Sequence, residues 1–410
     1  MKPEKLKPRS NYLNKLLQFK DIEAIKVVTG IRRCGKSKLM DLFIEEIKKQ
    51  GISTDNIIYM NFESLEFDFI TDYTVFYNYV KNKITNKDRY YLFFDEMHKV
   101  MHWEKAVNSF RVDFDVDIYL TGSNANLLSS DISSLIAGRY VEIKMLPLSY
   151  KEFLDFHSIE KNEDSFQLYL KYGSFPSIVE LGFNQDRIND ILEGIYNTVI
   201  LKDVLEQNDI KDETLLQKIV RFISDNIGNV TSPNSIAGSL VSNKQMEQNN
   251  KKKKSPARST VENYICALEK AYIFYVAQRY DVKGKELLKS LEKYYIVDIG
   301  MRNMLLGYRD VDRGHILENI VFLELLRRDY KVKIGKVGEK EIDFVAEKAN
   351  DKIYIQVSET LGNQEILERE LMPLLAIADN YEKWIITSDK TFVESYEGIK
   401  VKNAIDWLCE

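Results

Sequence analysis

The N-terminal part of the chain alternates between short apolar runs and longer stretches with a helical period. The apolar runs are typical of buried strands and cover residues 24–29, 56–63, 90–96, 117–124 and 141–145. Amphipathic helices are predicted between them, over residues 38–49, 73–84, 103–110 and 126–136. This alternation predicts an α/β fold in which helices cover both faces of a parallel sheet.

Beyond Pro147 the pattern changes to successive helices. Ser149 and Glu152 have the spacing of a capping box, which predicts the start of a helix, and further helices are expected over residues 166–172 and 186–204. A small helical lid fits this stretch. Three more helices and two apolar strands follow, at residues 213–226, 231–240, 259–271, 272–276 and 294–297. Three helices followed by a two-stranded ribbon predict a winged helix.

The C-terminal part returns to alternation of strand and helix. Helices are predicted over residues 316–328 and 364–377, and strands over residues 331–336, 341–346, 352–357 and 383–387. A chain of 410 residues is too long for one compact core. We therefore expect an α/β domain at residues 1–146, a lid at 147–206, a winged helix at 207–307 with a lysine-rich loop at 242–255, and a second α/β domain at 308–410.

Composition narrows the class of protein. The hydrophobic content of 44% is ordinary for a globular protein, and neither a membrane span nor the apolar core of a signal peptide is apparent, so we expect a cytoplasmic location. The three cysteines lack the spacing of a metal site or a disulfide framework. A net charge of -5 excludes a generally basic protein, so any contact with nucleic acid must come from a local patch.

The first predicted strand leads into a complete phosphate-binding loop, and a predicted helix follows it. Glycines let the loop direct its amide hydrogens at a β-phosphate, and the helix N-terminus adds its positive dipole. Lys36 is expected to bridge the β- and γ-phosphates, and the Ser37 hydroxyl to bind Mg²⁺. The sequence therefore predicts an ATP site made of Gly30, Ile31, Arg32, Arg33, Cys34, Gly35, Lys36 and Ser37.

A second pattern points to hydrolysis. The strand at residues 90–96 ends in Asp95 and Glu96. Asp95 is expected to hold Mg²⁺ through water, and Glu96 to polarise the attacking water. Ser123 and Asn124 follow another strand, and ligands of parallel sheets bind at the carboxyl ends of the strands. Either residue has the position to sense the γ-phosphate, although a polar turn after a core strand explains each one equally well.

These motifs together resemble a family of bacterial and archaeal ATPases of the AAA+ superfamily that carry a winged-helix segment and a C-terminal domain of unknown function. The resemblance rests on the run 29–37, on Asp95-Glu96, and on the segments 120–123, 138–139 and 146–149. It implies a sensor role for Ser123 or Asn124, an arginine finger at Arg139, and a homo-oligomer, with a hexamer favoured. Arg139 also fits a plain partner of a helix C-terminus.

A run of four lysines lies just before the third helix of the predicted winged helix. Lysine runs are often solvated loops, but this one has the position to contact DNA phosphates beside a recognition helix. The helix itself is not notably basic, so a winged helix that contacts protein stays open. The candidate DNA-binding residues are Lys251, Lys252, Lys253 and Lys254.

The C-terminal strands and helices resemble the restriction-endonuclease core. That resemblance places Glu318, Asp343 and Gln356 at the positions of the metal ligands. The position where the lysine of that core belongs is Ser358, and Gln356 removes one ligand charge. Since neither residue replaces the cation that activates water, we expect a degenerate site used for binding or assembly, with nuclease activity unlikely.

The leading hypothesis is a magnesium-dependent ATPase that couples ATP hydrolysis to DNA binding or remodelling. A switch that uses ATP to control a protein or DNA partner is the second hypothesis, and an ATP-gated nuclease is the third. The DNA form and the choice between motor and switch stay open.

Overall fold

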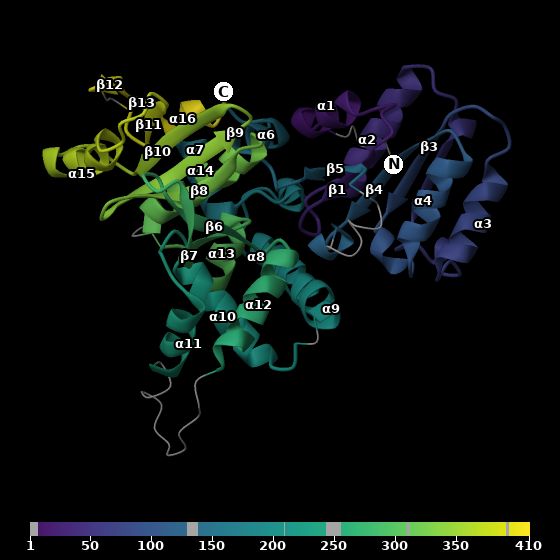
Figure 1. Cartoon of the computed structure of the whole chain (residues 1–410), viewed down its shortest axis with the longest axis horizontal. Helices are drawn as coiled ribbons and strands as arrows, with labels where there is room; N and C mark the ends of the chain where they lie inside the picture. Colours follow the sequence, from purple (N-terminus) through teal and green to yellow (C-terminus); the bar gives the residue numbers. More distant parts are fainter. Residues whose placement is uncertain (1–6, 129–137, 209, 243–255, 310–311, 391–392) are drawn as a thin grey trace, which may run out of the picture. The chain divides into compact units, whose positions relative to one another are not determined.

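The computed structural model describes residues 7–128, 138–208, 210–242, 256–309, 312–390 and 393–410. The chain forms two compact units. Unit 1 comprises residues 1–145 and 270–272, and unit 2 comprises residues 146–269 and 273–410. Figure 1 gives the labels of the helices and strands. The predicted helix at 126–136 and the four lysines at 251–254 lie largely or wholly outside the described residues.

Unit 1 contains a five-stranded sheet in the order β2-β3-β4-β1-β5, and all neighbouring strands in its described part are parallel. The expectation of a parallel α/β sheet is confirmed. The strands are β1 (Ile25–Thr29), β2 (Ile57–Asn61), β3 (Tyr90–Asp95), β4 (Val116–Gly122) and β5 (Tyr140–Lys144). The helices are α1 (Ser10–Gln18), α2 (Lys36–Lys49), α3 (Tyr73–Lys83) and α4 (Trp103–Asp113), with short 3₁₀ turns at Thr54–Asn56, Leu65–Phe67, Met97–Lys99 and Ala125–Leu128.

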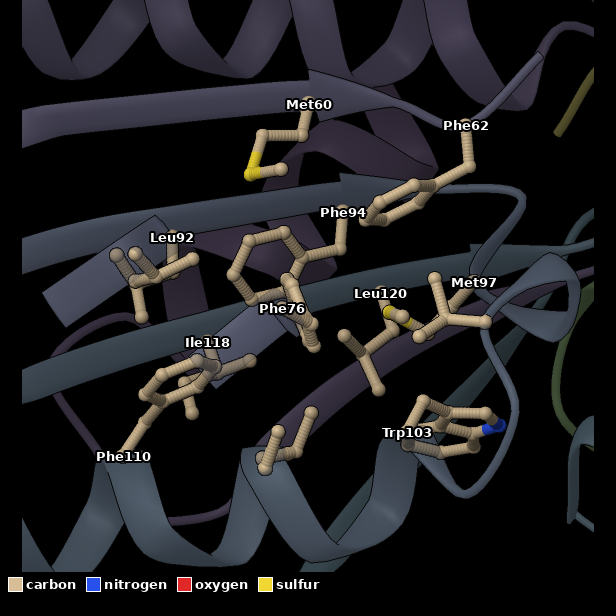
Figure 2. Close-up of a cluster of buried hydrophobic side chains, with 14 of the residues drawn as sticks. Met60, Phe62, Phe76, Leu92, Phe94, Met97, Trp103, Phe110, Ile118 and Leu120 are labelled. Atoms are coloured by element: carbon tan, nitrogen blue, oxygen red, sulfur yellow. The ribbon is translucent and has the colours of Figure 1, made fainter. Parts of the chain in front are cut away.

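Aromatic side chains attach helices to both faces of this sheet. On one face Phe43 of α2 packs against Phe93 and Tyr119. On the other face Phe76 of α3 packs against Phe94 and against Phe110 of α4, with ring centroids 4.8 and 5.3 Å apart. Figure 2 shows this second cluster, in which side chains from β2, β3 and β4 meet those of α3 and α4. Because alternate strand residues point to opposite faces, the central strands β1, β3 and β4 are buried on both faces.

The first part of unit 2, residues 150–208, is helical. It contains α6 (Tyr150–His157), α7 (Glu163–Tyr172), a 3₁₀ turn at Pro176–Leu181, α8 (Gln185–Thr198), a π-helical stretch at Val199–Leu205 and α9 (Glu206–Asn208). Ser149 caps α6 through the predicted capping box with Glu152. The later helices are α10 (Glu213–Asp225), α11 (Pro233–Ser242), α12 (Arg258–Lys270), α13 (Ile299–Leu306), α14 (Arg313–Arg327), α15 (Gln364–Leu375) and α16 (Ala404–Trp407).

The strands of unit 2 form an eight-stranded sheet in the order β12-β13-β11-β10-β9-β8-β6-β7 in the part that the structure describes. They are β6 (Phe274–Asp281), β7 (Glu286–Ile296), β8 (Lys331–Val337), β9 (Lys340–Lys348), β10 (Asp351–Ser358), β11 (Glu382–Thr387), β12 (Ser395–Tyr396) and β13 (Ile399–Asn403). β6 pairs in parallel with β8, so the ribbon β6–β7 continues the sheet of the C-terminal segment. A ribbon expected as the wing of a separate domain therefore shares a sheet with residues 331–403.

Both faces of the second sheet are also covered. Leu367, Leu371 and Leu374 of α15 belong to one apolar cluster with strand residues, and Phe322 of α14 packs with Tyr295 and Phe344. Among the described residues, no helix combines the length and the apolar character that crossing a membrane requires.

Candidate nucleotide-binding site

The loop between β1 and α2 has the backbone geometry that a phosphate cradle needs. Gly30 has a φ of 142°, and a Cβ there would lie 2.1 Å from the carbonyl oxygen of Met145. Gly35 has a φ of 105° and precedes the first residue of α2. A side chain would be strained at the first position and would collide there with the backbone. The loop therefore reaches the helix N-terminus in a form that leaves its amide groups and the helix dipole for an anion.

Lys36 lies in this loop with its charge directed at neutral groups. Its Nζ donates to the carbonyl oxygens of Gly30 and Ile31, at 2.9 and 3.2 Å, and the residue is 5% exposed. Arg9, which precedes α1, donates to the carbonyl oxygen of Cys34 at 3.0 Å and so holds the loop from outside. Since carbonyl oxygens offset an ammonium charge only in part, Lys36 retains positive charge that phosphate oxygens can neutralise.

Asp95, the last residue of β3, lies beside the start of α2. Its carboxylate accepts hydrogen bonds from the hydroxyls of Ser37, Thr121 and Tyr59, the last at 3.3 Å. Burial raises the pKa of Asp95, while the bonds from Thr121 and Ser37 act in the opposite direction. The two residues predicted to hold magnesium, Ser37 and Asp95, are therefore adjacent in the structure.

Glu96 lies one residue beyond the strand in a left-handed backbone conformation, with a φ of 54°. Its carboxylate accepts from Ser123 at 3.3 Å and lies 3.2 Å from Nδ1 of His98. Burial opposes its ionisation, but the nearby His98 and the charges of Lys36 and Arg32 outweigh burial and lower the pKa of Glu96 to about 2. The carboxylate is consequently ionised at neutral pH, as a group that polarises water must be.

The other residues predicted for the site differ in burial and in the residues that they contact. Ser123 contacts Glu96, and Asn124, 2% exposed, follows it in the chain. Arg32 pairs with Glu63 at 2.9 Å, and Arg33 is exposed with a φ of 64°. The hydrogen bonds therefore connect Ser123 to the proposed base.

Arg139 lies away from the phosphate loop of its own sheet. Its carbonyl oxygen accepts from the amide of Ile25, the first residue of β1, whereas the loop follows Thr29 at the opposite end of β1. A five-residue strand separates the two ends by roughly 15 Å. The side chain is exposed. This position does not favour a contact between Arg139 and the phosphates bound by the same unit.

Thr121 is, beside Arg9, Tyr59 and His98, a residue of this site that the sequence did not predict. It is fully buried, donates its hydroxyl hydrogen to Asp95 and accepts the backbone N–H of Glu96 at 3.0 Å. Its place near the carboxyl end of β4, two residues before Ser123, was the available signal. Threonine is common in strands, so a threonine within an apolar strand is only a weak indication of a functional residue.

A second cluster of charges lies in unit 2 and changes the interpretation of the C-terminal segment. Lys293 of β7 is 4% exposed, and its Nζ lies 2.9 Å from Glu318, 2.9 Å from Glu341 and 3.5 Å from Asp343. The charges of these carboxylates overcome the effect of burial and raise the pKa of Lys293. The expectation that this site lacks a cation is therefore wrong, because β7 supplies from another part of the chain what Ser358 does not.

Gln356 joins the same cluster through its amide group. Its oxygen accepts from the amide of Asp343 at 2.7 Å, and its nitrogen donates to Glu370 at 2.9 Å. A cavity of about 780 Å³ is lined by Glu318, Asp343, Gln356 and Ser358, among others. Within the described part of the chain, no group of three or more His, Cys, Asp or Glu side chains is arranged to hold a metal ion. An ammonium group lies among these carboxylates instead.

The residues of the first site fit ATP and magnesium by their chemistry. Ser37 and Asp95 offer the oxygen atoms that Mg²⁺ prefers, and Lys36 and the glycine cradle suit phosphate. An ionised Glu96 stands beside them. This arrangement suits the binding of a nucleoside triphosphate with Mg²⁺.

Comparisons with known proteins agree with this chemistry. Residues 23–154 match the model of a family described as "AAA domain", and residues 163–312 match a domain of unknown function, DUF8612. An uncharacterized protein of Haemophilus influenzae is 39% identical over 98% of each chain. The uncharacterized protein MJ1544 of Methanocaldococcus jannaschii is 30% identical, over 88% of this chain and 81% of its own length.

A solved structure, the Walker-type ATPase of Pyrococcus abyssi, is similar in fold. It has a TM-score of 0.50 and 15% sequence identity, and the match covers 73% of this chain and 95% of that one. The similarity concerns the fold, because the identity is low.

Proposed function

The chain belongs to a family of AAA-type P-loop ATPases that includes these bacterial and archaeal relatives, and we propose that it is a magnesium-dependent ATPase that couples ATP hydrolysis to the binding or remodelling of DNA. The observation that carries the ATPase proposal is the pairing of Asp95 with Ser37 beside an ionised Glu96. An ionised carboxylate beside the residues that would hold the phosphates and Mg²⁺ is placed to orient an attacking water.

Each side chain has one role in the proposed reaction. The loop amides and Lys36 bind the β- and γ-phosphates. Ser37 and Asp95 would hold Mg²⁺, and a bound Mg²⁺ would neutralise part of the phosphate charge. Glu96 orients and polarises the attacking water, and Ser123 holds Glu96 through the hydrogen bond of 3.3 Å.

Replacement of Glu96 by Gln tests the catalytic role. The variant should bind ATP with unchanged affinity and lose turnover by about 100-fold or more, since it keeps the shape and removes the base. Glu45→Gln on the exposed side of α2 is the matched control and should match the parent protein. Unchanged hydrolysis in Glu96→Gln would refute the assignment.

DNA is the proposed partner, and helices α10, α11 and α12 with the ribbon β6–β7 are the elements proposed as a winged helix. Lys251, Lys252, Lys253 and Lys254 remain the proposed phosphate contacts. The test measures the ATPase rate against linear duplex, branched and single-stranded DNA at two salt concentrations. The form of DNA on which the protein acts should stimulate ATP hydrolysis, and this stimulation should be smaller at the higher salt concentration. Replacement of the four lysines by Ala should also weaken the stimulation. Absence of stimulation by every form would favour a switch that acts on a protein.

A homo-oligomer, with a hexamer favoured, is proposed from the position of Arg139. An exposed arginine at the edge opposite to its own phosphate loop suits a contact with the nucleotide of a neighbouring subunit. Mixing Arg139→Ala with Lys36→Ala protomers should restore some activity, because one subunit supplies the site and the other the finger. Failure at every ratio would argue against action between subunits.

Lys293 favours a second candidate function, the cleavage of DNA under the control of ATP. A buried cation among carboxylates at a large cavity is a costly arrangement that ordinary packing does not require. The parent protein should then nick DNA with magnesium or manganese, and Asp343→Ala should abolish nicking while ATP hydrolysis continues. Absence of cleavage of any DNA form would remove this candidate.

A further inference from the structure

Thr121 connects the carboxylate of Asp95 and the backbone amide of Glu96 through a single hydroxyl group. A threonine hydroxyl carries one hydrogen, and Thr121 directs it to Oδ1 of Asp95. The oxygen accepts the backbone N–H of Glu96 at 3.0 Å. The donor and one acceptor position of the same group are thus used by two neighbouring residues with different proposed roles.

The surroundings fix this hydroxyl. Thr121 is 0% exposed and lies on β4, which pairs with β3 on one side and with β1 on the other. A β-branched side chain in such a strand has few rotamers, so its hydroxyl has little freedom. The strand therefore holds the oxygen of Thr121 at a defined point beside the end of β3.

Glu96 needs such support because its backbone is unusual. A φ of 54° at a non-glycine residue costs energy and persists where neighbours hold it. The N–H of Glu96 is the backbone group that Thr121 binds, and this bond fixes the plane of the peptide between Asp95 and Glu96. Rotation of that peptide would move both side chains at once.

We infer that Thr121 is a positioning residue that sets the metal-binding carboxylate of Asp95 and the water-orienting carboxylate of Glu96 relative to each other. The inference rests on the proposed ATPase function and deepens it. The side chain of Asp95 and the backbone of Glu96 cannot shift apart without breaking a bond to the hydroxyl of Thr121, so Thr121 restricts the movement of the two residues relative to each other. A misplacement of about 1 Å at such a site lowers the rate by about 100-fold.

Three variants test the role of the hydroxyl. Thr121→Val keeps the shape and removes the hydroxyl, Thr121→Ser keeps the hydroxyl, and Tyr77→Phe removes a hydroxyl hydrogen bond to Asp113, which takes no part in the site. We expect Thr121→Val to lower kcat by about 10- to 100-fold with the KM for ATP within about threefold, whereas Thr121→Ser and Tyr77→Phe stay within about threefold of the parent protein.

A binding measurement separates the position of Asp95 from activity. The affinity for a fluorescent ATP analogue is measured with EDTA and again with Mg²⁺. Thr121→Val should match the parent protein in EDTA and gain less affinity from Mg²⁺. Thermal melting confirms that each variant folds, and Thr121→Cys, with its weaker donor, replaces Thr121→Val if that variant does not fold.

Two outcomes would overturn the inference. Parental kcat and parental magnesium dependence in Thr121→Val would remove the role of the hydroxyl, and an equal loss in Thr121→Ser would assign the effect to packing. If the parent protein itself hydrolyses no ATP with Mg²⁺, the proposed ATPase function fails, and the binding measurement still decides whether Thr121 positions Asp95.

Discussion

The nucleotide site of unit 1 and the Lys293 cluster of unit 2 each contain a buried lysine and several carboxylates, but they use the lysine differently. Lys36 donates to two neutral carbonyl oxygens, whereas Lys293 lies within 3.5 Å of three carboxylates. The ammonium of Lys36 donates to carbonyl oxygens and acts on the charge of Glu96 without a hydrogen bond between them, whereas that of Lys293 is paired directly with carboxylates. Burial of a lysine is therefore common to both sites, and the partners of its ammonium group distinguish them.

The two regions also differ in how the chain assembles them. Lys36 and Ser37 are adjacent in sequence, as are Asp95 and Glu96. Lys293 is 25 residues from Glu318 and 50 residues from Asp343. A contiguous motif is visible in a single sequence, whereas a cluster formed by distant strands becomes visible only with the sheet.

The largest expected effect would come from removing the two lysines in turn. Lys293→Met should lower the free energy of unfolding by about 3–5 kcal/mol, because it leaves buried carboxylates without their cation. Lys36→Met should change it by about 1 kcal/mol or less, since two neutral acceptors offset only part of the cost of burying the ammonium.

Urea unfolding of both variants measures this difference. Tryptophan fluorescence reports on each unit, since Trp103 lies in unit 1 and Trp384 and Trp407 lie in unit 2. A Trp103→Phe background isolates the signal of unit 2, and Lys333→Met, which removes a half-buried pair with Glu347, is a control expected to cost about 1 kcal/mol or less. Equal losses in the two buried-lysine variants would show that the proposed difference between them is wrong.

A smaller effect concerns the dependence of stability on pH, in which two glutamates behave oppositely. Burial, with a contribution from Asp343, raises the pKa of Glu318 to about 7 despite Lys293. A raised pKa means that the stabilising contribution is complete below the unfolded pKa of about 4.5 and is lost as pH rises through about 7. The pKa of Glu96 is lowered to about 2, so its contribution is present above about 4.5 and is lost as pH falls toward 2.

Glu318→Gln and Glu96→Gln form a matched pair for this comparison. Between about pH 5 and 7 the free energy of unfolding of the parent protein should fall, with a slope of at most about 1.4 kcal/mol per pH unit from Glu318, and the melting temperature should fall with it. Glu318→Gln should flatten that fall, and Glu96→Gln should leave it unchanged. Identical profiles for the two variants would contradict the opposite shifts. Melting curves in a series of buffers at constant ionic strength supply the measurement.

The parallel sheet and the phosphate loop were predictable because their signals are local. Apolar runs marked β1, β3 and β4, and the glycines marked a loop that no other residue type can form at Gly30. The pairing of β6 with β8 was not predictable, since a strand carries no local mark of its partner. Lys293 was not predictable for the same reason, because it lies on β7, far in sequence from Gln356 on β10.

The capping of α6 and the position of Asp95 beside Ser37 followed directly from the sequence, whereas the role of Thr121 did not. Capping depends on residues three positions apart, and the pairing of Asp95 with Ser37 follows from the strand-loop-helix motif. Thr121 acts through one hydroxyl on a neighbouring strand, and the register of β4 against β3 was needed to see it.

The smallest expected effect tests how finely the nucleotide site depends on single hydroxyls. Ser123 donates to Glu96 at 3.3 Å, which is long for a hydroxyl donor, and the carboxylate also has His98 beside it. Ser123→Ala should therefore lower kcat by about 3- to 10-fold, since one hydrogen bond contributes about 0.5–1.5 kcal/mol. Steady-state ATPase assays of Ser123→Ala beside Thr121→Val measure the ranking. A loss in Ser123→Ala that exceeds the loss in Thr121→Val would mean that the side chain of Glu96, and not its backbone, is what strand β4 holds in place.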